Sequence, residues 1–145
     1  PTSLRDCAEA AIAEAQARAR QKNVAITLQG DGGSGPFEAA LVALAVSNLL
    51  DNAIDFSPVG GSVRVDLAGG RISVTDAGPG VPDYALPRLG ERFFSTPRPN
   101  GERTGSGLGL AIVRQIMALH HGNLNIVNLD PAAGPGLRAE LNFAI

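Results

Sequence analysis

The strongest constraint on this chain is an apolar run of helical period that ends at Phe56 and carries several Asn and Asp residues. Asn48, Asn52 and Asp55 stand at positions i, i+4 and i+7, so on a helix they share one face. Another face carries the apolar residues Val42, Val46, Leu49, Leu50 and Ala53. Asn is a poor helix former, because its amide competes with the backbone for hydrogen bonds. The run therefore predicts a core helix with a polar site on one side, although a solvated helix face explains this run equally well.

Length and composition indicate one globular domain. A chain of 145 residues with 44% hydrophobic and 18% charged residues can bury a core of its own. Its net charge of -2 gives no electrostatic footprint for nucleic acid or an anionic membrane, so we expect contact with neither. The single Cys7 excludes an internal disulfide and a cysteine-based zinc site. No apolar run approaches about 18 residues and no signal-peptide pattern is present, so we expect a soluble chain, and its start at Pro1 fits a piece cut from a longer protein.

Periodicity and turn residues predict three main helices and about five strands. The expected helices are 4–22, 36–56 and 108–121, and the expected strands are 24–28, 63–67, 72–76, 124–126 and 137–143. Ser3 opens a capping box before the first helix, Ser57-Pro58 ends the second, and Gly122 is the expected stop of the third. This order, without repeats or βαβ alternation, predicts a single α+β domain over residues 1–145. We expect a two-layer α/β sandwich, with helices on one face of a mixed, mostly antiparallel sheet.

Residues 82–104 form a long proline-containing stretch with only a short helical pattern, around Tyr84–Leu89. A long irregular stretch inside a compact domain is usually either a functional lid or a disordered segment. We predict a lid over about residues 82–104, directly before a glycine-rich helix start.

The segment Gly105-Ser106-Gly107-Leu108-Gly109 opens the third expected helix. Glycines at a helix N-terminus let the backbone approach an anion, and the unpaired N–H groups and positive dipole end favour phosphate. The segment is not a Rossmann fingerprint, because no βα turn precedes it, and not a Walker A loop, because no Gly-Lys-Ser/Thr follows. Taken alone, it fits a phosphate site and a tight packing turn equally well.

A second glycine-containing motif, Asp76-Ala77-Gly78-Pro79-Gly80, ends a predicted strand. A carboxylate at a strand end can accept a hydrogen bond from an exocyclic amine such as that of adenine. Taken alone, an ordinary Asp-x-Gly turn is the more frequent explanation.

The order of these motifs resembles the Bergerat pattern, the ATP site of the GHKL group that includes gyrase, Hsp90, histidine kinases and MutL. In this sequence NLLDNAIDFSP resembles the N box, DAGPGVP the G1 box, ERFF the F box and GSGLGL the G2 box. All four occur in the family's order, and the resemblance covers essentially the whole chain. It implies the Bergerat fold, which is an α/β sandwich.

Position 48 separates the subclasses of that group. Its hydrolases carry a Glu four residues before the metal-binding Asn, whereas this chain has Asn48, an amide that cannot act as a general base at neutral pH. The NLLxNA wording and the F box with Phe93 resemble sensor histidine kinases of bacterial two-component systems. More narrowly, NLLDNAIDFSP, VPDYALPRLGERFFSTPRPNG and SGLGLA resemble the CreC type.

The resemblance implies a role for each matching residue. Asn52, together with Asn48, would hold Mg²⁺ and the phosphates, because oxygen ligands suit this hard ion. Asp76 would recognise adenine through its exocyclic amine. The base pocket would be formed by Phe56, Gly78, Gly80 and Val81. The phosphates would be bound by Gly105, Ser106, Gly107, Leu108 and Gly109.

Residues of the predicted lid also receive roles from the resemblance. Phe93 and Phe94 would anchor one end of it. Arg98 or Arg103 would help to neutralise the phosphates, because many histidine kinases place a basic residue where this chain has Asp55.

Two positions and two histidines need a separate interpretation. Asp55 removes one cation from the predicted phosphate site, and Leu137 replaces the Thr that often lies beside the adenine pocket of the family. His120 and His121 end a predicted helix, where an imidazole can interact favourably with the helix dipole and the exposed carbonyl groups. We therefore interpret both as structural. By this interpretation the phosphoacceptor and dimerisation domain is absent from the chain.

As a histidine-kinase module, the chain is expected to bind ATP with Mg²⁺ and to donate the γ-phosphate to a histidine on a separate dimerisation domain of the same kinase. That histidine would pass the phosphate to a response-regulator aspartate, and the module would lie in the cytoplasm as part of a membrane-bound sensor. No catalytic base is assigned, since the base would lie beside the acceptor histidine. The alternatives are a GHKL-type ATPase or anti-sigma serine kinase, and a degenerate nucleotide-binding interaction module.

Overall fold

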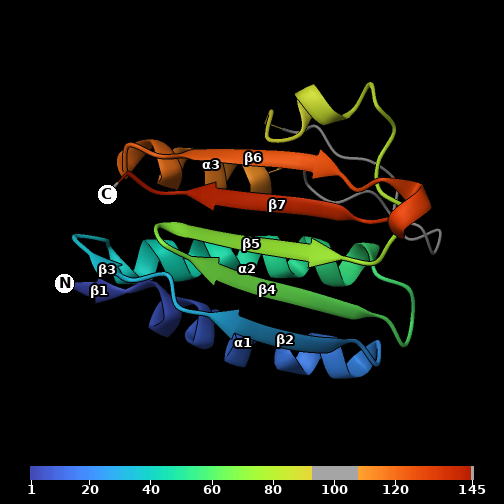
Figure 1. Ribbon diagram of the computed structural model, residues 1–145, viewed down its shortest axis with the longest axis horizontal. Coiled ribbons are helices and arrows are strands. Elements are labelled where there is room, and N and C mark those ends of the chain that lie inside the picture. Colours follow the sequence, from blue (N-terminus) through green and yellow to red (C-terminus); the bar gives the residue numbers. More distant parts are fainter. Residues whose placement is uncertain (93–107, 145) are drawn as a thin grey trace.

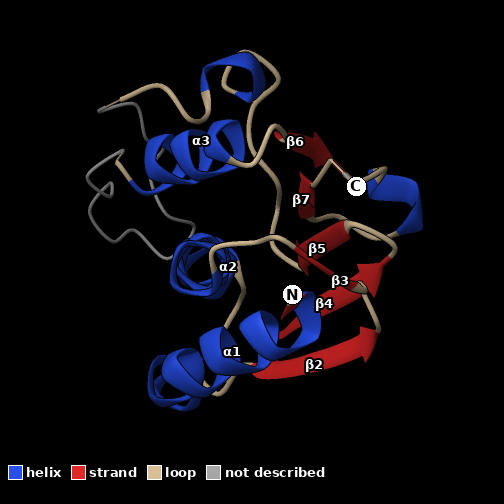
Figure 2. Ribbon diagram, turned by 90° about the vertical axis from the view of Figure 1, so that its left-hand side faces the viewer, coloured by secondary structure: helices blue, strands red, loops and turns tan. Residues whose placement is uncertain are grey.

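The computed structural model describes residues 1–92 and 108–144, which form two layers (Figure 1; Figure 2). The first layer is a sheet with the strand order β2-β4-β5-β7-β6. Its strands are β2 (Ala25–Gly30), β4 (Ser62–Ala68), β5 (Arg71–Asp76), β6 (Asn123–Asn128) and β7 (Leu137–Asn142). The second layer consists of the helices α1 (Leu4–Gln21), α2 (Ala39–Phe56) and α3 (Gly109–Leu119), which lie on one face of this sheet. Short elements are β1 (Thr2–Ser3), β3 (Ser34–Gly35), η1 (Leu86–Arg88) and η2 (Pro131–Ala133).

The sheet is mixed. β2 pairs with β4 in parallel, whereas the β4–β5, β5–β7 and β6–β7 pairs are antiparallel. The last strand in sequence, β7, lies between β5 and β6 (Figure 1). The predicted two-layer α+β sandwich, with helices on one face of a mostly antiparallel sheet, is therefore confirmed.

Alternation along the strands decides which sheet face meets the helices. In β4, Val63 and Val65 are buried, while Ser62 and Arg64 beside them are exposed. The register continues this apolar row across the sheet, because Val65 pairs with Val74 and Val74 pairs with Ala139. Residues of α2 cover the row with fully buried side chains, among them Val42, Val46 and Leu50. The apolar face of α2 is thus used for the core, which leaves its polar residues for other contacts.

α2 corrects one expectation about apolar segments. By length and composition this helix is apolar enough to cross a membrane, because only Asp51 and Asp55 are charged among its 18 residues. Asn48 and Asn52 interrupt the apolar run, but the mean hydropathy of the helix is still high enough for a membrane-spanning segment. Within the fold, however, α2 packs against α1, α3 and β5 with eight buried residues. Buried core helices pass the same test of length and composition, so the result is weak evidence for a membrane span.

Small side chains bring α1 close to its neighbours. Ala8, Ala11, Ala15 and Ala19 are all at most 5% exposed and belong to the main core. The N-terminus of α1 is capped as predicted, since the Ser3 hydroxyl accepts a hydrogen bond from the Asp6 N–H group at 3.2 Å.

His120 joins the end of α3 to the start of α2. The Glu38 N–H group, at the N-cap of α2, donates to His120 Nε2 at 3.1 Å, and His120 Nδ1 lies 2.8 Å from the Ile116 carbonyl oxygen. Because Nε2 accepts, Nδ1 must carry the proton, and the ring is the neutral tautomer. The ring also packs against Phe37 and, edge-on, against Phe143. These contacts confirm a structural role for His120.

Three local predictions differ from the structure. The second helix begins at Ala39 rather than near Pro36, because residues 34–35 pair with β1 as a two-residue strand. The helical pattern around residues 84–89 yields only the one-turn η1, which has a proline in its first turn. After α3, His121 rather than Gly122 adopts the left-handed conformation, with φ of 57°. Gly122 is needed for a different reason, because a Cβ there would lie 2.2 Å from the Asn142 carbonyl oxygen.

Candidate functional site

Asp76 is the last residue of β5, and its carboxylate is buried there, with 5% of the residue exposed. The N–H groups of Gly78 and Leu137 both donate to Oδ1, at 2.8 and 3.2 Å. Burial raises the pKa of Asp76 above its ordinary value, and the two hydrogen bonds offset only part of that rise. Within residues 1–92 and 108–144 no hydrogen bond reaches Oδ2, so this oxygen remains an acceptor for a ligand donor.

Two glycines allow the backbone to close around Asp76. A Cβ on Gly78 would lie 2.2 Å from the Phe56 carbonyl oxygen, at the end of α2. A Cβ on Gly136 would lie 2.3 Å from the Asp76 carbonyl oxygen. Gly78 was predicted from its motif, but the role of Gly136 was missed, because its contact with Asp76 joins positions far apart in the sequence. Both glycines thus fit a cradle in which α2, β5 and β7 converge.

Asn128 fixes the loop that follows Asp76, and the sequence analysis missed this residue too. Its side-chain Oδ1 accepts from the Val81 N–H group at 2.9 Å, and its Nδ2 donates to the Val81 carbonyl at 2.7 Å. The predicted Gly80 adopts φ of 78°, and a Cβ there would lie 2.5 Å from Asn128 Oδ1. A lone Asn at a strand end carries no recognisable signal, since its partner lies 47 positions earlier.

A second, smaller apolar cluster lies beside Asp76. Phe56, Val81, Ala85 and Leu89 are buried in it, and Leu137 packs against it as a partly buried residue. The predicted base-pocket residues Phe56 and Val81 therefore do lie together. Leu137, the departure from the family pattern, contributes its backbone N–H to Asp76 and its side chain to this cluster.

The polar face of α2 meets the start of α3. Asn48 Nδ2 donates to the Gly109 carbonyl at 3.3 Å, which joins the two predicted motifs. Asn52, one turn further along α2, is half-buried. Leu108 is the N-cap of α3, and its apolar side chain cannot cap the N–H groups of the first turn. The structure thus places Asn48 beside the predicted phosphate-binding helix end.

Asp55 contacts α1. Its carboxylate pairs with the Arg18 guanidinium, which also pairs with Asp51 at 2.9 Å. Burial lowers the pKa of Arg18, but the two carboxylates more than offset this, so the pKa is raised overall. Lys22 Nζ adds hydrogen bonds to the carbonyls of Ile54 and Asp55, at 3.0 and 2.8 Å. The negative charge of Asp55 is therefore compensated by α1.

Seven residues with predicted roles lie outside the described residues. They are Phe93, Phe94, Arg98, Arg103, Gly105, Ser106 and Gly107. Their roles remain predictions, as does the lid beyond residue 92.

For a metal ion, the described residues offer amide oxygen ligands rather than a cluster of acidic side chains. Among residues 1–92 and 108–144, no group of three or more His, Cys, Asp or Glu side chains could hold an ion. The amide oxygens of Asn48 and Asn52 fit Mg²⁺, which usually keeps several waters and takes few protein ligands when it binds with substrate phosphates.

Comparison with known proteins agrees with this geometry. The chain matches the family described as "Histidine kinase-, DNA gyrase B-, and HSP90-like ATPase" over residues 38–144, and it belongs to that family. It is 48% identical over 97 residues to the sensor protein CreC of Escherichia coli (strain K12), which covers 64% of this chain and 20% of CreC. It is 41% identical over 130 residues to the sensor protein QseC of Escherichia coli O157:H7, covering 88% of this chain and 28% of QseC. The chain thus spans between a fifth and three tenths of these relatives' lengths.

Solved structures show the same arrangement. The mycobacterial sensor histidine kinase MprB superposes with a TM-score of 0.83 at 30% identity, covering 99% of this chain and 96% of that one. The cytoplasmic segment of histidine kinase QseC gives 0.71 at 26% identity, covering 99% and 76%. Full-length ShkA in complex with AMPPNP gives 0.76 at 25% identity, covering 99% and 31%. The chain is therefore an ATP-binding catalytic domain of the type found in sensor histidine kinases, as the motif order and the CreC resemblance predicted.

Proposed function

We propose that this domain binds ATP with Mg²⁺ and donates the γ-phosphate to a histidine on a separate dimerisation domain of the same kinase, which relays it to a response-regulator aspartate. The base would lie at the carboxyl end of β5, and the phosphates would lie between α2 and the start of α3. The names of the relatives support a kinase, since CreC and QseC are sensor proteins and MprB is a sensor histidine kinase.

The observation that carries this proposal is the buried carboxylate of Asp76. Two backbone donors occupy Oδ1, which orients the carboxylate and leaves Oδ2 for the exocyclic amine of adenine. Phe56 and Val81 supply the apolar surroundings that a base requires. A buried acceptor that loses its donor costs free energy, so the site favours a base with an amine at that position.

Phosphate and metal binding is assigned to the other end of the site. Asn52 and Asn48 would contribute amide oxygens to Mg²⁺, which would supply charge neutralisation at the phosphates. The Asn48 amide already donates to Gly109 through Nδ2, so its Oδ1 is the atom left for an ion or a bound water. The N-terminus of α3 adds a positive dipole end for the phosphates.

Transfer is favoured over hydrolysis by the residue at position 48. An amide cannot abstract a proton from water at neutral pH, and positioning with charge neutralisation provides most of the catalysis in phosphoryl transfer. The residues of this chain would therefore bind and orient the nucleotide, while the acceptor histidine and its base would come from the other domain. A serine kinase of the same fold would use an equivalent site on a different protein substrate.

The alternative of a degenerate module had two supports, Asp55 and Leu137, and each has another explanation. Asp55 is compensated by Arg18, and the Leu137 side chain packs against the apolar cluster of Phe56 and Val81 while its backbone still donates to Asp76. The solved part of QseC that resembles this chain is a cytoplasmic segment of that kinase, and we assign this domain to the same compartment as part of a membrane-bound sensor.

Isothermal titration calorimetry tests the binding step. We expect ATP and ADP to bind, ATP to bind more tightly when Mg²⁺ is present, and Asp76→Asn to weaken the binding of both nucleotides by about 100-fold or more. The transfer step is tested by mixing the domain with the phosphoacceptor domain of its own kinase and measuring acid-labile phosphate on that partner. Nucleotide binding without any transfer to a histidine would support the serine kinase, and steady ATP turnover by the isolated domain would support the hydrolase.

A further inference from the structure

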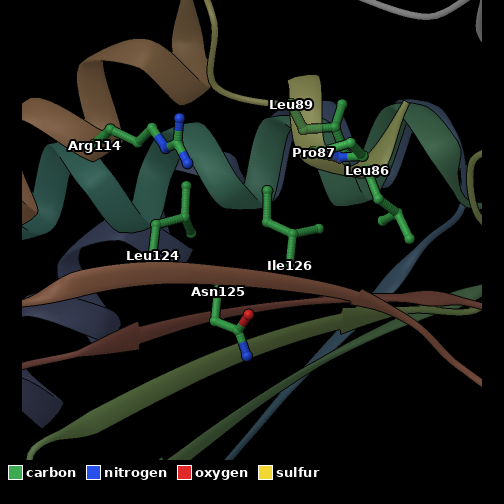
Figure 3. A pocket seen from close by; sticks show the side chains of 7 residues that line it. All are labelled: Leu86, Pro87, Leu89, Arg114, Leu124, Asn125 and Ile126. Carbon is green, nitrogen blue, oxygen red and sulfur yellow. The ribbon is translucent and has the colours of Figure 1, made fainter. Parts of the chain in front are cut away.

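A cavity of about 340 Å³ lies on the flank of the molecule, where η1, α3 and the edge strand β6 meet (Figure 3). Leu86, Pro87 and Leu89 form one wall, and Leu124 and Ile126 of β6 form the floor. Arg114 of α3 reaches across the remaining side. The side chain of Asn125 points to the opposite face of β6.

This cavity differs from the proposed nucleotide site. None of the described residues that are assigned to base, phosphate or metal lines it. Gly109, which contacts Asn48, and Arg114 are five positions apart on α3, so they point about 140° apart around the helix axis. The cavity is therefore a separate pocket, although its wall of Leu86, Pro87 and Leu89 belongs to the first part of the predicted lid.

The aliphatic stem of Arg114 holds the guanidinium over the cavity. The stem lies against Gly90, where a Cβ would be 2.7 Å from Arg114 Cδ, and Gly90 adopts φ of 94°. In the part of the chain that the structure describes, the Arg114 guanidinium makes no hydrogen bond or ion pair. A guanidinium favours planar anions, because its N–H groups can donate two parallel hydrogen bonds to one carboxylate.

Apart from Asn125, whose side chain points away, the other lining residues have apolar side chains. Leu89 is 7% exposed, and Leu124 and Ile126 are partly buried residues that pack against the two apolar clusters. Ligand pockets typically have volumes of about 300–1,000 Å³, and the volume of this cavity lies at the lower end of that range. An apolar floor with one cation at the rim matches a ligand with an aliphatic chain and one anionic head.

We propose that this cavity is a binding site for an aliphatic carboxylate, with the chain against Leu124, Ile126 and Leu89 and the carboxylate on the Arg114 guanidinium. The charge of Arg114 selects the anion against neutral and cationic molecules with the same chain. β6 is an edge strand, and an extended peptide could pair with it, but pairing of that kind would not need the cavity or its cation.

Amide chemical-shift titration of the whole chain, without nucleotide, tests the site with three probes of equal chain length: decanoate, decanol and decyltrimethylammonium. Decanoate is expected to shift residues 86–90, 114 and 124–126 and to bind about tenfold more tightly than decanol, as one charge-assisted hydrogen-bonded pair allows. The cationic probe should bind most weakly of the three.

Variants separate the charge from the apolar floor. Arg114→Gln should remove the preference for decanoate over decanol, and Leu124→Ser should weaken both. Arg71→Gln changes an exposed arginine on β5 outside the cavity and should alter neither affinity. Equal binding of all three probes, or shifts outside the cavity, overturns the proposal, and so does an acidic peptide that shifts β6 where decanoate does not. Because nucleotide is absent, none of these results bears on the proposed ATP site.

Discussion

The two ends of the proposed nucleotide site are built differently. At the base end, Asp76 receives two backbone hydrogen bonds, and Asn128 makes two more to the following loop. At the phosphate end, the Asn48 side chain of α2 donates to the Gly109 carbonyl at the start of α3, at 3.3 Å. The difference teaches that paired hydrogen bonds and close packing orient the carboxylate at the base end, whereas at the phosphate end a side-chain amide joins α2 to the start of α3.

The largest effect is expected from Asp76→Asn at the base end. The amide keeps an acceptor for the Gly78 and Leu137 N–H groups but places its NH₂ group against the adenine amine. Because two donors then face each other, we expect ATP affinity to fall by about 100-fold or more in calorimetry. Unchanged affinity in a folded variant would show that Asp76 does not contact the base, and the proposed contrast between the two ends would then be wrong.

The same substitution should change the pH dependence of stability. The pKa of Asp76 is raised in the folded protein. Its contribution to the free energy of unfolding is therefore fully present below the pKa of the unfolded chain, and it is lost as the pH rises through the folded pKa. In the nucleotide-free protein, Asp76→Asn should therefore flatten the fall in unfolding free energy over the acidic range just above the ordinary aspartate value. Denaturant unfolding at several pH values measures this free energy. If it depends on pH in the same way in both proteins, the Asp76 carboxylate is not destabilised by burial.

The next effect tests the close packing of the base end. Gly78→Ala places a methyl group against the Phe56 carbonyl, and we expect a loss of about 2–3 kcal/mol in unfolding free energy, because backbone must move. Gly69→Ala is the matched control, since nothing lies within 4 Å of a Cβ at that glycine. If both variants unfold at the same denaturant concentration, the cradle is not tightly packed.

A smaller effect is expected at the Asn128 clamp. Asn128→Ala leaves the N–H and C=O groups of Val81 without their partner, which should cost about 1–3 kcal/mol in unfolding free energy and weaken nucleotide binding. Asn125→Ala, on the same strand but with an exposed side chain, provides the control. Equal stability of the two variants would mean that the loop after Asp76 is ordered by other contacts.

At the phosphate end, Asn48→Ala should matter more for the ligand than for the fold. Loss of one long hydrogen bond should cost about 0.5–1 kcal/mol in unfolding free energy. ATP affinity with Mg²⁺ should fall further than ATP affinity without it, since Asn48 is assigned to the metal. A variant that loses stability but keeps the Mg²⁺ dependence would assign Asn48 to the packing of α3 alone.

The smallest effect is expected from Asp55→Asn. Partly exposed ion pairs contribute about 0–1 kcal/mol, so we expect only a minor loss of stability and a change in ATP affinity of at most about twofold. A large gain in ATP affinity would show that the charge of Asp55 does reach the phosphates despite Arg18.

The sequence predicted those parts of this structure that depend on local pattern. Helical and alternating periodicity indicated the three helices and the five main strands, because burial of one face leaves that signature in the chain. Asp76, Gly78 and Gly80 were predicted as a motif, and the order of motifs provided the fold. Contacts between distant positions leave no such signature. Asn128 with Val81, Gly136 with Asp76, and Arg18 with Asp55 each depend on the tertiary arrangement.

The position of β7 has a consequence for how the domain matures during synthesis. β7 lies between β5 and β6, yet among the strands of this sheet it is the last to leave the ribosome, and its first residue, Leu137, supplies one of the two donors to Asp76. A nascent chain that has reached only Asn128 has β5 and β6 without the strand that joins them, and their edges are open to pairing with other chains. The nucleotide pocket is thus complete only after β7 has been synthesised and has inserted between β5 and β6, and copies of the domain that lack β7 lack one of the two donors to Asp76.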